Sequence, residues 1–266
     1  MLSLIHLTNY STNIYTQYKD ASNLNARINL HDLYSTNKQG WFIWLLSSLQ
    51  LSYYDKVLGI GCGDGSLWRN QGANYNITLS DKSEGMVNDD RRNLGDKFNY
   101  QVIRCEAIPF LDDSFDVVVA NYFLFYLEDL SKELLEISRV LKDNGRFICS
   151  TYGKEHMKEI DVLVKKFDNS IYLSSNNLYE VFGKENGASI LGQYFNDVEW
   201  IQYEDSLFVD NVDVLIAYIV SCHGNQNEII LARYQEFRNF VIREMKDGLR
   251  ITKDAGIFVC KQIVKK

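Results

Sequence analysis

The chain has 266 residues, of which 46% are apolar and 24% are charged, as in an ordinary globular protein. Its 28 Lys and Arg residues against 35 Asp and Glu residues give a formal net charge of −7. This sign disfavours a protein whose main task is to bind the phosphates of long nucleic acid. No run reaches the roughly 18 apolar residues of a membrane span, and the N-terminus does not resemble a secretory leader, so we expect a cytoplasmic protein without membrane insertion.

Cysteine and histidine spacing gives no sign of a metal or a disulfide framework. The five cysteines are dispersed without a C-x-x-C pair, and the four histidines are equally scattered. We therefore predict reduced thiols and no metal site.

The first predicted elements are two helices. Leu24, Ile28 and His31 recur at helical spacing, and a second helical pattern follows the break at Asn37–Gly40. We interpret residues 1–50 as an N-terminal helical cap.

Short apolar runs then alternate with segments long enough to be helices. The runs predicted as strands are Lys56–Ile60, Ile77–Ser80, Tyr100–Ile103, Phe115–Ala120 and Arg146–Ser150. This alternation is typical of the Rossmann-like α/β class, with a mostly parallel sheet and helices on both faces. Residues 51–153 would be the cofactor-binding core of that sheet.

The C-terminal part is predicted to insert helices between the last strands. The residues from Lys154 to Phe195 are polar with helical spacing, and strand-like runs follow at Val198–Tyr203 and Gly256–Ile263. The two late strands could pair at one edge of the same sheet.

Two further helices are expected between these strands, near Val212–Ser221 and Glu228–Met245. Residues 154–250 would then hold the insertion helices and the sixth strand, and residues 251–266 the last strand. Because no linker rich in Gly, Ser or Pro interrupts the chain, we predict a single domain over residues 1–266.

The most informative segment is VLGIGCGDGSL at residues 57–67, where a buried strand breaks into glycines and is expected to enter a helix. Such a turn lets the backbone approach a ligand closely at the carboxyl end of a sheet. The dinucleotide fingerprint G-x-G-x-x-G fails, because Asp64 or Ser66 stands where its last glycine belongs. The sequence therefore does not favour a nicotinamide cofactor.

The second strand ends in a carboxylate, Asp81, followed by Lys82 and Ser83. A carboxylate there can accept hydrogen bonds from both hydroxyls of a cofactor ribose. Alternatively, Asp81 could simply cap the next helix. Given the glycine loop upstream, we favour ribose binding.

Together with Glu106–Asn121 and Glu136–Arg146, these motifs resemble class I S-adenosylmethionine-dependent methyltransferases of the methyltransferase type 11 family, the ubiquinone/menaquinone-biosynthesis type. The resemblance runs from about Val57 to Thr151. It implies a seven-stranded sheet that binds S-adenosylmethionine across the ends of its first four strands.

The resemblance also implies a set of cofactor contacts. On the methionine and ribose side they are Gly61, Cys62, Gly63, Asp81, Asn121 and Tyr122. On the adenine side they are Lys82, Met86, Cys105, Glu106 and Ala107.

Three positions depart from the family's pattern. Gly59 replaces a usual acid that helps to hold the cofactor's amino group, Arg104 replaces a frequent acid before the adenine segment, and Tyr126 replaces a frequent histidine. We keep Gly59 among the predicted cofactor-binding residues. If the strand end is ordinary extended backbone, an aspartate at this position should strengthen cofactor binding.

Several roles remain alternatives. Tyr126 and His156 are the candidate catalytic residues. Arg27 could close over the cofactor's carboxylate, or its stem could pack while its head reaches water or an acid. Trp41 and Trp44 are interpreted as core aromatics.

The favoured function is methyl transfer from S-adenosylmethionine to a small-molecule acceptor, through an O, N or C nucleophile. The first alternative is a catalytically silent protein that binds S-adenosylmethionine or S-adenosylhomocysteine. The second is a protein-interaction module on the same fold, which would bind no nucleotide.

Overall fold

The computed structural model of the chain describes residues 22–71, 75–174 and 177–264. Residues 1–21 of the predicted cap and residues 265–266 of the predicted last strand lie outside this part. The α-helices are α2 (Ser22–Tyr34), α3 (Trp41–Leu49), α4 (Glu84–Leu94), α5 (Leu130–Val140), α6 (Lys158–Phe167), α7 (Leu178–Val181), α8 (Lys184–Leu191), α9 (Val212–Val220), α10 (Gln226–Ala232) and α11 (Tyr234–Glu244). Two 3₁₀ turns accompany them, η1 (Ser66–Trp68) and η2 (Leu124–Tyr126).

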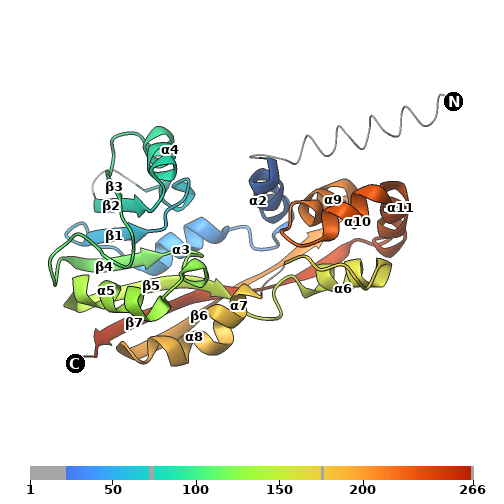
Figure 1. Cartoon of the computed structure of the whole chain (residues 1–266). Coiled ribbons are helices and arrows are strands. Elements are labelled where there is room, and N and C mark those ends of the chain that lie inside the picture. Colours follow the sequence, from blue (N-terminus) through green and yellow to red (C-terminus); the bar gives the residue numbers. More distant parts are fainter. Residues whose placement is uncertain (1–21, 72–74, 175–176, 265–266) are drawn as a thin grey trace. The chain divides into compact units, whose positions relative to one another are not determined.

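The seven predicted strands form one sheet in the order β3-β2-β1-β4-β5-β7-β6 (Figure 1). They are β1 (Lys56–Ile60), β2 (Asn76–Asp81), β3 (Asn99–Val102), β4 (Phe115–Ala120), β5 (Leu141–Tyr152), β6 (Phe195–Val209) and β7 (Leu249–Ile263). Strands β1 to β5 pair in parallel, and β7 runs antiparallel to β5. The predicted Rossmann-like class is confirmed, and the last two strands are neighbours at one edge, as expected.

Strand β4 shows why helices cover both faces of the sheet. Its side chains alternate, so that Val118 and Ala120 pack in one apolar cluster with residues of α5 and α8. Val117 and Val119 pack in another cluster with residues of α3 and α4. A strand buried on both faces explains the unbroken apolar run in the sequence.

Two helix predictions need correction. The glycine loop does not lead into a full helix: Gly65 is left-handed with φ 74°, and only the single 3₁₀ turn η1 follows it before residue 72. The helix predicted over Glu228–Met245 is divided into α10 and α11, because Arg233 leaves the helical region at φ −122° and ψ 32°. The helical periodicity of the sequence continues through such a break and therefore does not predict it.

The chain divides into two compact units. The sheet unit consists of Gln39–Lys154, Leu178–Tyr203 and Asp254–Lys266, and the helical unit of Met1–Lys38, Glu155–Asn177 and Glu204–Lys253. Helix α2 therefore belongs to the helical unit, whereas α3 belongs to the sheet unit. Strands β6 and β7 each supply residues to both.

The helical unit has an apolar core of its own. It contains Leu30 from α2, Ile160 from α6, Leu215 from α9 and Phe237 from α11, all buried. None of the helices in the described part of the chain has the length and apolar character to cross a bilayer.

Arg139 fastens α5 to the loop that precedes β4. Its guanidinium donates to both carboxylate oxygens of Glu136, to Asp112, and to the backbone carbonyls of Ile108 and Phe110, all within 2.7–2.9 Å. The planar fork of an arginine can serve several acceptors at once, whereas a lysine ammonium cannot reproduce that geometry.

We expect Arg139→Ala to lower the free energy of unfolding by about 2 kcal/mol or more, because it removes five charge-assisted hydrogen bonds, three of which join α5 to the loop that precedes β4. Arg139→Lys should recover only part of this loss. Urea denaturation measures both. In the control Arg92→Ala, which removes an exposed pair with Asp89, the change should stay within about 0.5 kcal/mol. Equal stability of the Arg139→Ala and control variants would contradict the conclusion that Arg139 holds α5 against the loop that precedes β4.

Candidate functional site

The glycine loop makes a tight turn at the carboxyl end of β1. Gly61 and Gly63 both have φ 62°, in the left-handed region that favours glycine. A Cβ at Gly61 would collide with the ring of Phe123. The backbone N–H of Cys62 donates to the carbonyl of Ser80 at 3.0 Å, which fixes the loop to the end of β2.

Asp81 ends β2 and faces this loop. One carboxylate oxygen accepts from the N–H of Gly63 at 3.3 Å, and the other accepts from the N–H of Ser83 at 2.9 Å. The N-cap of α4 is Ser83, whose hydroxyl accepts from the N–H of Met86. The alternative in which Asp81 itself caps that helix is therefore wrong.

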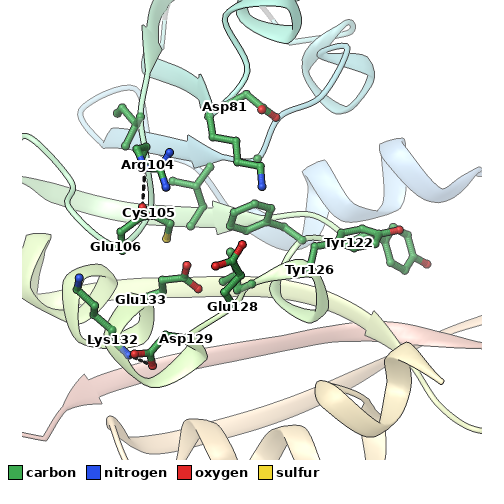
Figure 2. Close-up of a pocket in the computed structure, with 16 residues that line it drawn as sticks. Asp81, Arg104, Cys105, Glu106, Tyr122, Tyr126, Glu128, Asp129, Lys132 and Glu133 are labelled. Carbon is green, nitrogen blue, oxygen red and sulfur yellow. Dashed lines mark hydrogen bonds and ion pairs between the residues drawn. The ribbon is translucent and has the colours of Figure 1, made fainter. Parts of the chain in front are cut away.

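A pocket of about 690 Å³ opens beside Asp81, at the carboxyl ends of the strands (Figure 2). One wall comes from β1, β2 and the residues after β3, and the opposite wall from η2, α5 and the residues between them. The lining residues are Ile60, Gly61, Asp81, Lys82, Ile103, Arg104, Cys105, Glu106, Tyr122, Phe123, Tyr126, Leu127, Glu128, Asp129, Lys132 and Glu133.

A smaller pocket of about 70 Å³ shares the lining residues Ile60 and Gly61 with the first. It reaches Cys62, Trp68 and Asn121. The two pockets therefore adjoin at Gly61, where the ring of Phe123 packs in the space of the missing side chain.

The turn after β4 is held by a small polar network. The hydroxyl of Ser150 donates to the side-chain oxygen of Asn121 at 2.8 Å and accepts from the N–H of Tyr122 at 2.7 Å. The indole N–H of Trp41 donates to the same Asn121 oxygen at 3.2 Å, and its ring stacks on Tyr122 with centroids 5.0 Å apart. Trp41 thus packs against the predicted site as well as against other aromatic rings.

The structure brings together most of the predicted contacts. The residues of that set that line one of the two pockets are Gly61, Cys62, Asp81, Lys82, Cys105, Glu106, Asn121 and Tyr122, and Tyr126 lines the larger one. The members of the set that line neither pocket are Gly63, Met86, which is 42% exposed on α4, and the exposed Ala107.

Arg27 and His156 belong to the helical unit. The guanidinium of Arg27 donates to the carbonyl of Ser221 at 3.4 Å and contacts the ring of His223, so its head meets the end of α9 rather than an acid. The roles suggested for Arg27 and His156 toward a cofactor or a substrate stay predictions.

Sequence reasoning missed the acidic wall of the larger pocket, which includes Glu128, Asp129 and Glu133. A signal for one of them was available. Glu133 stands on the stripe of α5 that carries Leu134 and Ile137 and faces the core, where a charged side chain is unusual.

Buried carboxyl groups lie on both sides of the site. Burial, reinforced by the charges of Asp64 and Asp81, raises the pKa of Asp90 in α4 to about 7. Burial also raises the pKa of Glu133 to about 7, with further contributions from Glu106 and Asp129. Both groups can therefore keep a proton near neutral pH.

The two thiols of the site are poor nucleophiles. Burial raises the pKa of Cys62 and that of Cys105 far above the ordinary range, so both stay protonated. Within the described residues, no cluster of three or more His, Cys, Asp or Glu side chains could hold a metal ion.

Gly59 does not offer an empty place for an acid. Its φ lies outside the left-handed region, but a Cβ there would lie 2.8 Å from the sulfur of Cys62 and 3.3 Å from the ring of Trp68. A side chain there would crowd Cys62 and Trp68, which also line the smaller pocket. The expectation that an aspartate here would strengthen cofactor binding stays a prediction, but this crowding adds a cost to the stability of the fold.

We now expect Gly59→Asp to destabilise the fold by about 2 kcal/mol or more, since it crowds the core and buries a charge. Gly59→Ala should cost less. The matched control is Gly85→Asp, because Gly85 is exposed in the first turn of α4, where an acid is favourable. Thermal melting compares the three variants. A Gly59→Asp protein as stable as the control would show that this strand end accommodates a side chain.

Comparison with known proteins finds similarity to methyltransferases. The family model described as "Methyltransferase domain" matches residues 58–149. The ubiquinone/menaquinone biosynthesis C-methyltransferase UbiE of Rickettsia typhi is 31% identical over 155 residues, which are 53% of this chain. The chain spans 60% of the length of that relative.

Solved structures agree on the fold. A SAM-dependent methyltransferase from Thermotoga maritima aligns over 97% of this chain and 98% of its own length, with 13% identity and a TM-score of 0.51. The cyclase SpnF aligns over 93% and 96%, also with 13% identity and a TM-score of 0.51. At such identities the likeness concerns the fold alone.

Proposed function

Because residues 58–149 of the chain match the family model described as "Methyltransferase domain", we propose that this protein binds S-adenosylmethionine and transfers its methyl group to a small-molecule acceptor. The observation that carries the proposal is the pairing of the Gly61–Gly65 loop with Asp81 beside a pocket at the strand ends. Ligands of open α/β sheets bind at this edge. The family model matches only the predicted cofactor-binding core. The proposal therefore describes the acceptor only as a small molecule.

The two pockets suit a long ligand bent across Gly61. With the ribose at Asp81, the base would occupy the larger pocket, and the amino-acid end would extend toward Cys62 and Asn121 in the smaller one. The polar network of Asn121 and Ser150 would hold the backbone after β4 in place beside the reacting methyl group.

The cofactor supplies a methyl group activated by its sulfonium. An in-line displacement at that carbon depends chiefly on positioning, so this chain's residues mainly have to orient donor and acceptor and exclude water. Where the acceptor must lose a proton, Tyr126, which lines the larger pocket, is the proposed base, and the catalytic role of His156 stays a prediction. All five cysteines are free thiols, which supports the proposal of a cytoplasmic protein.

A second candidate is a protein that binds the cofactor without methyl transfer. The favouring observation is that Gly59, Arg104 and Tyr126 depart from the pattern of the family that the sequence resembles. Two measurements separate the candidates. Calorimetry with S-adenosylhomocysteine tests binding, and transfer of an isotope-labelled methyl group to a panel of phenols, amines and activated carbon acids tests catalysis. Absence of binding at millimolar ligand would contradict both.

For Asp81→Ala we expect an affinity for S-adenosylhomocysteine roughly ten-fold lower or worse, because a charge-assisted hydrogen bond contributes about 1.5–3 kcal/mol. Asp81→Asn should lose less, since its side-chain oxygen can still accept a hydrogen bond. Its amide nitrogen cannot accept, however, so one of the Gly63 and Ser83 N–H contacts is lost in this variant too. Calorimetric titration gives the dissociation constants, and melting curves show whether each variant is folded. An unchanged dissociation constant in Asp81→Ala would leave Asp81 with only its role in the loop.

A further inference from the structure

Glu133 is a buried acid that the fold itself does not use. It lies in the first turn of α5, 5% exposed, and no described residue hydrogen-bonds its Oε2 atom. A buried polar atom without a partner is costly, so it calls for an explanation. Figure 2 shows its carboxyl group directed from α5 into the larger pocket, on the side of Cys105.

The surroundings of Glu133 favour its neutral form. The acids that face it are Glu106, from the segment after β3, and Glu128 and Asp129, from the segment before α5. The cation that opposes them is Lys82, which follows β2. Burial and the three acids together raise the pKa of Glu133 to about 7.

A neutral carboxyl group presents one donor and one acceptor side by side. The Watson–Crick edge of adenine presents the complementary pair, the ring nitrogen N1 as acceptor and the 6-amino group as donor. An ionised carboxylate fits this edge less well, because one of its oxygens would oppose the lone pair of N1.

The path of the cofactor leads its base to this position. If the ribose binds at Asp81, which lines the larger pocket, and the amino-acid end extends toward Cys62 and Asn121 in the smaller one, the base is left in the larger pocket. There it lies between Cys105 and the wall formed by α5. On the basis of the proposed function, we infer that protonated Glu133 recognises the adenine of S-adenosylmethionine, donating to N1 and accepting from the 6-amino group.

The test compares Glu133→Gln with Glu133→Leu by calorimetry with S-adenosylhomocysteine. A glutamine offers the same donor and acceptor as the protonated acid, so its affinity should stay within about three-fold of the wild type. Leucine offers neither and should lower the affinity roughly ten-fold. Leucine also suits the apolar stripe of α5, and melting curves check that both variants fold. Glu199→Gln, on the exposed part of β6, controls for the lost charge.

Two further readouts separate adenine recognition from a merely structural role. Above pH 7 the affinity of the wild type for S-adenosylhomocysteine should fall, approaching a ten-fold decrease for each further pH unit, because Glu133 must take up a proton before the ligand binds. The affinity of Glu133→Gln should show no such fall. An analogue of S-adenosylhomocysteine whose purine lacks the 6-amino group should bind the wild type several-fold more weakly than S-adenosylhomocysteine does. Glu133→Leu should not distinguish the two ligands.

The outcomes are distinct. Equal affinity of wild type and Glu133→Leu for S-adenosylhomocysteine overturns the inference while the proposed function stands. Affinity that rises with pH and is lost in Glu133→Gln also overturns it, because the ionised acid would then be the acceptor. Failure of the wild type to bind at any pH overturns the proposed function and the inference with it.

Discussion

The site depends on one constraint, the close approach of backbone to backbone where β1 ends. Because Gly61 has no side chain, Phe123 can pack against the loop, and because Gly63 is left-handed, its N–H turns toward Asp81. The hydrogen bond from Cys62 to Ser80 then joins the loop to the neighbouring strand. Both pockets are lined by Gly61, so both depend on the shape of this turn.

Two acidic residues near the site stand at buried positions where an apolar residue is usual. Asp90 in α4 is fully buried beside Gly65, and Glu133 occupies the core-facing stripe of α5. A well-packed apolar residue at either place would be expected to stabilise the fold. This cost in stability is more readily understood for Glu133, which lines the larger pocket, than for Asp90, which lines neither pocket.

The fold and the chemistry are separate questions in this protein. The same architecture, at similar overall likeness, is found in a methyltransferase and in a cyclase. What they can share is the sheet edge and its loop, because these follow from strand order and glycine positions. The reaction itself must depend on side chains that project from the ends of the strands and from the helices around them.

The sequence alone determined the local features. The bounds of β1 and β4 agree with their apolar runs residue for residue, and the glycine loop and Asp81 were identified from their order along the chain. These features depend on neighbours in sequence: a run buried on both faces, glycines at a turn, a polar residue where a strand ends.

Only the tertiary structure decided which distant groups meet. The sequence does not reveal that a side chain at Gly59 would meet Trp68, that Trp41 hydrogen-bonds Asn121, or that Glu133 faces the pocket. Nor does periodicity reveal that α2 and α3 belong to different compact units. Periodicity tells which side of an element is buried, but what lies against that side depends on the strand order and on contacts between residues far apart in the chain.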